Sequence, residues 1–427
     1  MLTGKKRVIV LCVLSAIAGL VYLTPFLRFS FYDQMQEALQ LTDIQIGSIG
    51  FIYGFFNVVS YVPTGFLAEK FNTKKLLVIS TLGMCVMTIW YSFYPGFTAI
   101  MVIHAMYGIF SVGTFWSPYL KAIRSLASEE QQGTIFGLSE GLRGMAQTAV
   151  AFICLGVLGA VGTVTVGFRA ILWVNAAVFA LLTVAVIVLV PDFDKERAEQ
   201  AAAAGEEVKS ASTIETLKAF PKALTNPSIW ICIFIVMCGF CLWSSINGYL
   251  GTYCTRVLQI PANISSGLSI IRSYIVVFVA GISGGFIVDR FKTKGLAMAV
   301  AFAGAAISAA GVLLTHNMMY VCIIVTIVLA YMVNVLKATY WSILGDAGIP
   351  LEATGIATGV ISLIGLTPDF FAAPIISRFI AYGESVGNVE LGFNMMLIWL
   401  VVWAVLGILG GLILKKKKEN MLKAAVK

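Results

Sequence analysis

Six ionisable side chains lie inside long apolar stretches of the sequence: Arg28, Glu140, Arg143, Arg272, Lys337 and Asp369. An ionisable group at the depth of a bilayer is costly, and it usually binds a ligand or a coupling ion. The six side chains carry a net charge of +2, so a cavity lined by them attracts anions. The planar donor fork of arginine matches carboxylate, phosphate and sulfonate groups. These residue types therefore predict a binding site for a small organic anion.

Three of these side chains are predicted to contact the anion: Arg28, Arg272 and Lys337. Arg272 is the principal candidate, because it lies in the middle of its stretch with no acidic residue within four positions. Asp369 is either a proton-coupling site or the counter-ion of Arg272. Arg28 has an alternative position at the outer surface, which its long side chain reaches if its helix ends early.

Glu140 and Arg143 are three positions apart, so on one helix they either neutralise each other or take part in ion coupling. Four aromatic residues are expected to line the cavity, or else to pack against lipid and other helices: Tyr22, Trp116, Trp243 and Tyr340. Cys238 and Cys241 have dithiol spacing, but their apolar surroundings favour packing over redox chemistry. We find no nucleotide-binding loop, hydrolytic constellation or metal-binding histidines in the sequence. We therefore expect no enzymatic activity, no cofactor and no metal site.

The elements that must position these residues are predicted to be membrane-spanning helices. Only 12% of the 427 residues are charged, whereas soluble proteins contain roughly 25%. Stretches of about 20 apolar residues, enough to cross a hydrocarbon core, recur along the whole chain. Twelve spans are predicted: 8–36, 43–68, 76–94, 98–123, 132–159, 166–190, 228–254, 262–288, 296–315, 317–344, 353–382 and 391–414.

The distribution of basic residues predicts the orientation of the spans. If the N-terminus is cytoplasmic, 22 of the 29 lysines and arginines lie in cytoplasmic segments. This bias places both termini in the cytoplasm. It also accounts for the net charge of +8 without a nucleic-acid partner.

One long polar segment divides the spans six and six. The predicted domains are an N-terminal bundle (1–190), a cytoplasmic linker (191–227), a C-terminal bundle (228–414) and a basic cytoplasmic tail (415–427). Asn226 followed by Pro227 is a typical helix start and predicts the beginning of the seventh span.

The two halves repeat one another. "GFLAEKFNTKK" at 65–75 matches "GFIVDRFKTKG" at 285–295, an offset of 220 residues. Two further matches, "EEQQGTIFG" at 129–137 with "LEATGIATG" at 351–359 and "FWS" at 115–117 with "YWS" at 340–342, have offsets of 222 and 225. Repeated halves of this kind enclose a central cavity in many secondary transporters.

Twelve spans in two repeated halves, with the pattern G-x-x-x-[DE]-[KR]-x-x-x-[KR] after spans 2 and 8, resemble the major facilitator superfamily. The resemblance covers the whole chain and implies an all-α membrane protein of two pseudo-symmetric six-helix bundles. It also implies that the acidic residue of each motif reaches the start of span 5 or span 11 when the cytoplasmic side closes. The predicted latch consists of Gly65, Glu69, Lys70, Arg124, Gly285, Asp289 and Arg290.

"PFLRFSF" around Arg28 and "SEEQQGTIFG" are similar to the organophosphate–phosphate antiporter branch. That resemblance implies anion binding by an arginine in span 1, which matches Arg28, and by another in span 7. The span 7 counterpart here is Trp243 or a neighbour, and no arginine stands there.

The leading hypothesis is a secondary active transporter that moves a sugar phosphate, sulfonate or carboxylate across the plasma membrane, here a bacterial inner membrane, by alternating access. The expected partners are the anion, the bilayer, and a coupling proton or exchanged anion, and the protein is expected to act as a monomer. Two alternatives remain open: transport of a neutral sugar or drug-like solute, and a non-transporting sensor of the same fold.

Overall fold

The computed structural model describes residues 4–126, 132–195, 224–349 and 354–425, and all regular structure within them is helical. Twelve helical segments of the described chain are long and apolar enough to cross a membrane. Helices are the expected result, because lipid offers no hydrogen-bond partners and a helix satisfies its own backbone groups. The predicted all-α fold class is confirmed.

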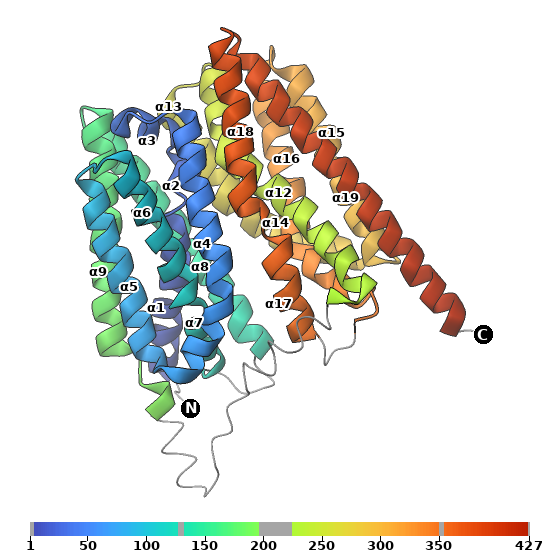
Figure 1. Ribbon diagram of the computed structural model, residues 1–427, viewed down its shortest axis with the longest axis horizontal. Helices are drawn as coiled ribbons and strands as arrows, with labels where there is room; N and C mark the ends of the chain where they lie inside the picture. The colour runs from blue at the N-terminus through green and yellow to red at the C-terminus, as the bar shows by residue number, and fades with distance from the viewer. Residues whose placement is uncertain (1–3, 127–131, 196–223, 350–353, 426–427) are drawn as a thin grey trace, which may run out of the picture. The chain divides into compact units, whose positions relative to one another are not determined.

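The chain divides by its contacts into two compact units. Unit 1 contains Met1–Leu27, Gln34–Leu41 and Ile52–Thr213. Its helices are α1 (Gly4–Leu23), most of α3 (Tyr32–Leu39), the later part of α4 (Asp43–Lys70), α5 (Thr73–Ser92), α6 (Phe97–Gly108), the π-helical η1 (Ile109–Gly113), α7 (Trp116–Arg124), α8 (Gln132–Ala160) and α9 (Val164–Leu189) (Figure 1).

Unit 2 contains Arg28–Asp33, Thr42–Phe51 and Ile214–Lys427, so it includes parts of the first two spans. Its remaining helices are α2 (Leu27–Ser30), α12 (Pro227–Arg256), α13 (Ala262–Ile270), the π-helical η3 (Ile271–Ile275), α14 (Val276–Asp289), α15 (Lys294–Thr315), α16 (Met319–Thr339), the 3₁₀-helical η4 (Tyr340–Leu344), α17 (Thr354–Gly365), α18 (Pro368–Ser385) and α19 (Val389–Ala425).

The predicted first span, 8–36, is not one helix. It divides into α1, the short α2 and α3, with a turn at Thr24–Phe26. Pro25 lies in this turn, and proline disrupts a helix because it lacks a backbone N–H and clashes with the preceding turn. The interruption places Arg28 on α2, and therefore on the part of the span that belongs to unit 2.

Three other spans are irregular in the middle. Span 11 is interrupted at Leu366–Thr367, and α18 then starts at Pro368 with Asp369 in its first turn. Spans 4 and 8 each contain a π-helical turn, η1 and η3, and η3 carries Arg272. Interrupted helices and π turns are common at the functional sites of membrane transporters.

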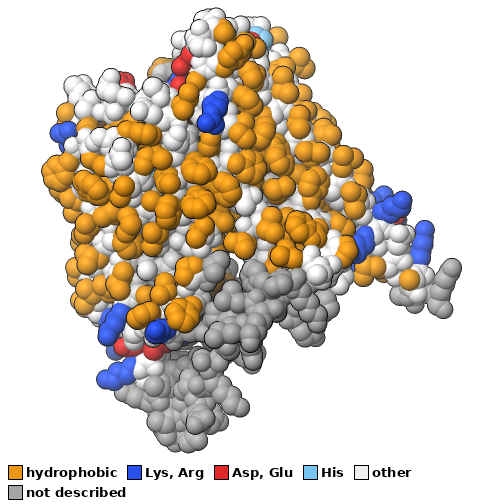
Figure 2. Space-filling view, viewed as in Figure 1, with side chains coloured by type: hydrophobic (Ala, Val, Ile, Leu, Met, Phe, Trp, Pro, Cys, Tyr) orange, Lys and Arg blue, Asp and Glu red, His pale blue; other side chains and the backbone are white. Residues whose placement is uncertain are grey.

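The outer faces of the helices are apolar. Leu314, Tyr320 and Ile307 are among many large apolar side chains that are exposed. In Figure 2 such side chains cover the length of the helices on the visible face, and lysines and arginines gather mainly near the helix ends. A surface of this kind suits lipid as its solvent rather than water.

Two sequence features at the borders of unit 2 can be compared with the structure. α12 begins at Pro227 and the Asn226 side chain accepts a hydrogen bond from the Ser228 N–H, so the predicted start of span 7 is confirmed. The basic residues 415–418, predicted as a tail, continue α19 as helix. The predicted linker lies largely outside the described residues, and the domain boundaries stay a prediction.

Candidate functional site

Arg28 lies deep inside unit 2 and is 2% exposed. Two glycines leave space for its guanidinium. A Cβ atom built on Gly248 of α12 lies 3.2 Å from Arg28 Nη1, and one built on Gly50 of α4 lies 3.2 Å from Nη2. The burial excludes the alternative in which Arg28 extends to the outer surface.

Asp369 is the acidic member of the same region and is 6% exposed. A Cβ built on Gly50 lies 3.2 Å from Arg28 Nη2 and 2.8 Å from the Cβ of Ala373, one turn after Asp369 on α18. The positive charges of Arg28 and of Lys337 on α16 favour the ionised form of this carboxyl. Asp369 also lies in the first turn of α18, where the positive end of the helix dipole favours a negatively charged side chain. Within the described residues, Asp369 Oδ1 accepts no hydrogen bond. We call Arg28, Lys337 and Asp369 the central cluster.

Aromatic rings surround the cations of the central cluster. The Lys337 ammonium lies 3.3 Å from the centroid of the Trp243 ring, a cation–π contact. The Trp243 ring also meets Phe29 edge to face at 5.9 Å. Tyr340 follows Lys337 by one turn, and its ring lies 3.5 Å from a Cβ built on Gly239. Two of the predicted aromatic residues, Trp243 and Tyr340, therefore lie beside or near the predicted cation Lys337.

Arg272 is also buried, with 4% exposure, but its described contacts are different. Its guanidinium donates to Ser269 Oγ at 3.0 Å and to Thr326 Oγ1 at 3.3 Å, and Cys254 Sγ lies at 3.6 Å. Thr326 and Lys337 are eleven residues apart on α16, which is about 16 Å along a helix. The structure thus brings Asp369 together with Arg28 and Lys337, and it places Arg272 in a neutral polar environment.

The surroundings of Arg272 form a narrow internal space in unit 2 with essentially no volume open to a water molecule. Ser273 and Asn247 lie beside it, and the Ser273 hydroxyl donates to Asn247 Oδ1 at 2.7 Å. A buried cation whose described partners are all neutral is costly unless an anion joins it. The predicted role of Arg272 in anion binding stays a prediction.

Unit 1 holds the remaining predicted site residues in one group. Glu140 and Arg143 form an ion pair at 3.2 Å, as the neutralisation alternative expects. The Arg143 guanidinium lies 5.0 Å from the centroid of the Tyr22 ring, and Tyr22 meets Trp116 edge to face at 6.3 Å. Glu140 is the exposed member of the pair.

The predicted latch is only partly described. The Glu69 side chain and the starts of spans 5 and 11 lie outside the described residues. Asp289 is exposed and forms an ion pair with Lys294. The other latch residues lie near helix ends at partly or fully exposed positions: Gly65, Lys70, Arg124, Gly285 and Arg290. The role of the latch stays a prediction.

Near these motifs, unit 1 contains an ion pair that the sequence analysis did not identify. Asp194, which follows α9, pairs with Lys121 of α7 at 2.5 Å and accepts the backbone N–H of Thr73 at 2.6 Å. The carboxylate therefore ties α7 and α9 to the start of α5.

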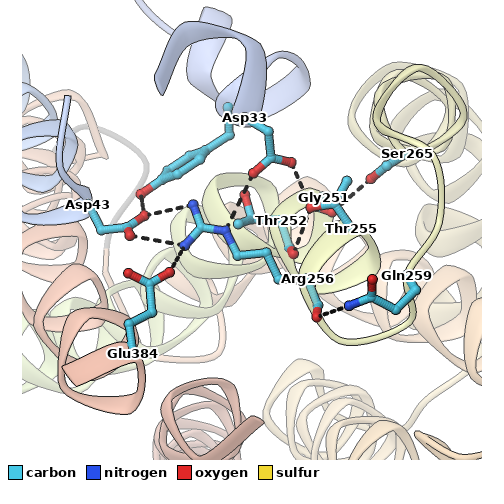
Figure 3. Close-up of polar contacts among 10 residues, drawn as sticks. Asp33, Asp43, Gly251, Thr252, Thr255, Arg256, Gln259, Ser265 and Glu384 are labelled. Atoms are coloured by element: carbon cyan, nitrogen blue, oxygen red, sulfur yellow. Dashed lines mark hydrogen bonds and ion pairs between the residues drawn. The ribbon is translucent and has the colours of Figure 1, made fainter. Parts of the chain in front are cut away.

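Unit 2 contains a second group that the sequence analysis missed, centred on Arg256 at the end of α12 (Figure 3). Its guanidinium holds Asp43 in a bidentate pair at 2.9 and 3.1 Å. It also pairs with Glu384 at 2.7 Å and approaches Asp33 at 3.6 Å. The Tyr32 hydroxyl donates to Asp43 at 2.6 Å. We call these five residues the Arg256 cluster.

The Arg256 cluster joins segments that are far apart in the sequence, since Asp33 and Asp43 precede Arg256 by more than 200 residues. Asp43 is only 2% exposed, so its charge depends on the arginine. Burial raises the pKa of Asp33, and hydrogen bonds from Thr255 and the charge of Arg256 oppose that rise. The only sequence signal was Arg256 itself, one of few basic residues on the predicted outer side.

Comparisons with known proteins agree with this architecture. The chain is 25% identical to the inner membrane protein YihN of Escherichia coli K12 over 99% of this chain and 100% of that protein. It is 22% identical to the probable galactarate/D-glucarate transporter GudP of Bacillus subtilis over 91% and 89%. A solved bacterial homologue of the human lysosomal transporter Spinster, inward-facing and unoccupied, matches with a TM-score of 0.74 at 12% identity, covering 97% and 99% of the two chains.

The sequence profile of the Major Facilitator Superfamily matches residues 11–373, which includes every residue of the central cluster. Together with the twelve membrane-length helices of the described chain, this match shows that the protein belongs to the Major Facilitator Superfamily, a family of membrane transporters.

Proposed function

We propose that the protein is a secondary active transporter that carries a small organic anion across the bacterial inner membrane by alternating access. The observation that carries the proposal is the central cluster of charges. The Arg28 guanidinium lies 4.7 Å from the Phe29 ring, Phe29 meets Trp243 at 5.9 Å, and the Lys337 ammonium lies 3.3 Å from Trp243. The cluster has one positive charge in excess. A substrate anion offsets that excess and lowers the cost of burying the cations.

The chemistry of the side chains and one relative support an anionic substrate. Arginine and lysine bind carboxylate, phosphate and sulfonate groups, and Arg28 has the fork suited to all three. GudP is named for galactarate and D-glucarate, which are sugar acids. We therefore propose a sugar carboxylate, sulfonate or phosphate as the substrate. Trp243 and Tyr340 provide rings against which a sugar can lie.

Energy coupling is proposed to come from a proton or an exchanged anion. Asp369 is the buried carboxylate of the central cluster. It is therefore the candidate either for binding the coupling proton or for releasing Arg28 and Lys337 so that they can bind the substrate. Glu140 and Arg143 neutralise each other in unit 1. We propose a structural role for that pair.

Alternating access requires contacts that close each side of the membrane in turn. We propose that the Arg256 cluster closes the outer side, since it ties the ends of α4, α12 and α18. The latch motifs are proposed to close the cytoplasmic side, with both termini on that side. We propose that the domains are the predicted bundles and that the protein acts as a monomer.

Transport by purified protein in liposomes tests the proposal. We expect accumulation of at least one labelled anion among D-gluconate, D-glucarate, glucose 6-phosphate and glucose 6-sulfate, and none of D-glucose. Accumulation of D-glucose alone favours the neutral-substrate alternative. Binding without accumulation, with every imposed proton or anion gradient, favours a sensor and contradicts the proposal.

A further inference from the structure

The C-terminal end of α19 carries a basic groove that the proposed function does not use. We infer that this groove binds the headgroup of an anionic phospholipid, with the phosphate held by Lys416 and Lys417. The inference goes beyond the proposed function, because it concerns a different surface of unit 2 and does not depend on what the protein carries.

The first step is the depth of the lysines in the bilayer. The predicted last span ends at Leu414, and α19 continues through Lys415–Lys418 without a break. Four residues rise about 6 Å along a helix, which is within the roughly 5–8 Å depth of one headgroup layer. Figure 2 shows basic side chains gathered at this end of α19. The lysines therefore lie at the level of lipid phosphates, on whichever side of the membrane the helix ends.

The second step is that other parts of unit 2 hold this end of α19 in place. Lys418 pairs with Asp346 at 3.6 Å. A Cβ built on Gly348 lies 2.7 Å from Met421 Cε, so the Met421 side chain packs on the turn that contains Gly348. A site along this part of the helix is therefore formed before a ligand arrives, which lowers the entropic cost of binding.

The third step is the groove itself, which has a volume of about 490 Å³. Its lining residues recur at helical spacing along one side of α19: Ile413, Lys416, Lys417, Asn420, Met421 and Ala424. Ile413 is an exposed apolar side chain on the membrane-spanning part, and the two lysines follow it by about one turn. A phospholipid has the same order, from acyl chain to phosphate. A soluble anion contacts the basic part alone, whereas a phospholipid contacts both parts.

The fourth step is the charge of the groove. Lys416 is exposed and has no ion-pair or hydrogen-bond partner among the described residues. Lys417 donates to a neutral group, the Ser228 hydroxyl. The two flanking lysines have carboxylate partners instead: Lys415 with Glu419 at 3.8 Å, and Lys418 with Asp346. Lys416 and Lys417 are therefore the cations of this run that are available to a phosphate.

Native mass spectrometry of the full-length protein in detergent measures the binding. The protein is titrated with dioleoylphosphatidylglycerol, which carries one negative charge, or with dioleoylphosphatidylcholine, which has the same acyl chains and no net charge. A lysine near an anionic lipid headgroup contributes about fivefold in affinity. We therefore expect phosphatidylglycerol to bind the wild type about tenfold tighter or more than phosphatidylcholine.

Two double variants separate the groove from basic charge in general. Lys416→Gln combined with Lys417→Gln should lower the affinity for phosphatidylglycerol about twentyfold, and Lys416→Gln alone about fivefold. The single variant breaks no contact with a described residue, so it reports binding without a change in folding. Lys5→Gln combined with Lys6→Gln is the matched control, because it removes two exposed lysines at the start of α1. We expect the control to bind phosphatidylglycerol like the wild type.

Equal binding of the two lipids, or an equal loss in the two double variants, overturns the inference. Inorganic phosphate and a tetraglutamate peptide are added as competitors in a second titration, and we expect neither to displace phosphatidylglycerol at a comparable concentration. Displacement by phosphate shows a site for a soluble anion, and displacement by the peptide shows a site for an acidic protein segment. Either result contradicts the lipid assignment. Transport is not measured in these titrations, so the proposed function is tested separately.

Discussion

Lys121 and Asp194 form an ion pair in unit 1. The corresponding positions of unit 2 hold the opposite charges, Asp346 and Lys418, and these two side chains pair at 3.6 Å. Asp346 follows Lys121 by 225 residues and Lys418 follows Asp194 by 224, which are nearly the offsets of the sequence repeats. In each unit the aspartate accepts a backbone N–H at the start of the third helix of the repeat, from Thr73 or from Lys294. Each unit therefore has an ion pair at this place, and the lysine and the aspartate are exchanged between the two corresponding positions.

This relationship predicts that the unit 1 pair tolerates reversal but not a single change. Lys121→Asp places two carboxylates together, and we expect a lower apparent melting temperature in detergent, from about 1 kcal/mol of lost pairing and repulsion. Lys121→Asp combined with Asp194→Lys reproduces the arrangement of unit 2. The double variant should recover most of the loss. A double variant less stable than both single variants contradicts the equivalence.

We predict that the equilibrium between the closed and open forms of the Arg256 cluster shifts toward the closed form at acidic pH. The pKa of Asp33 is raised in the cluster, so the closed form binds a proton more readily than an open, hydrated form. Protonation therefore favours closure as the pH falls from neutral toward the usual carboxyl pKa of about 3.9, and the effect is lost as the pH rises.

Labelling of a cysteine placed at Gln259, beside the cluster, measures this closure. We expect slower labelling at pH 5.5 than at pH 7.5, and Asp33→Asn should label slowly at both. Arg256→Gln should label rapidly at both, because it leaves the buried Asp43 without its arginine and costs about 3 kcal/mol. If the labelling rate of the otherwise wild-type protein is the same at both pH values, protonation of Asp33 does not control the closure.

Gly248→Ala is predicted to impair anion uptake by crowding Arg28. The added methyl lies 3.2 Å from Nη1, closer than ordinary van der Waals contact, and must displace the guanidinium. Gly281→Ala is the matched control, because a Cβ there meets nothing within 4 Å. We expect about a tenfold loss of apparent affinity for Gly248→Ala alone, measured as tracer uptake at equal protein levels. Equal uptake by the two variants refutes the prediction.

Much of this architecture was predictable, because hydropathy and basic residues define spans and the repeats define halves. The three members of the central cluster were identified from their depth in apolar stretches. Their grouping was not, because whether Asp369 joins Arg28 or Arg272 depends on the interruptions of spans 1 and 11. Pro25 and Pro368 signalled those interruptions, but a sequence pattern does not give the direction in which the chain continues.

The missed contacts have a different explanation. The Lys121 pair joins residues 73 positions apart, and the Arg256 cluster joins residues more than 200 apart. All of them lie near span ends, where charged residues are common and carry no signal of their own. The offset of 225 residues would have aligned Lys121 with Asp346, which indicates that repeats are best searched for exchanged charges as well as for identities.

Arg272→Gln is predicted to reduce uptake strongly while the protein remains folded. Glutamine keeps hydrogen bonding toward Ser269 and Thr326 but removes the positive charge that the sequence predicts to contact the anion. Charge-assisted hydrogen bonds contribute about 1.5–3 kcal/mol, so we expect a loss of roughly tenfold to a hundredfold in uptake. Size-exclusion chromatography in detergent reports folding separately. Uptake at the wild-type rate removes Arg272 from the anion site without affecting the central cluster.

The most direct measurement of the central claim is equilibrium binding of the transported anion to Arg28→Gln and Lys337→Gln in detergent, beside Arg378→Gln. Arg378 is an exposed arginine of α18 in the same unit, so its substitution removes a charge away from the cluster. If Arg28 and Lys337 bind the anion, each of the first two variants loses about tenfold or more in affinity and Arg378→Gln binds like the wild type. Unchanged affinity in Arg28→Gln and Lys337→Gln contradicts the account.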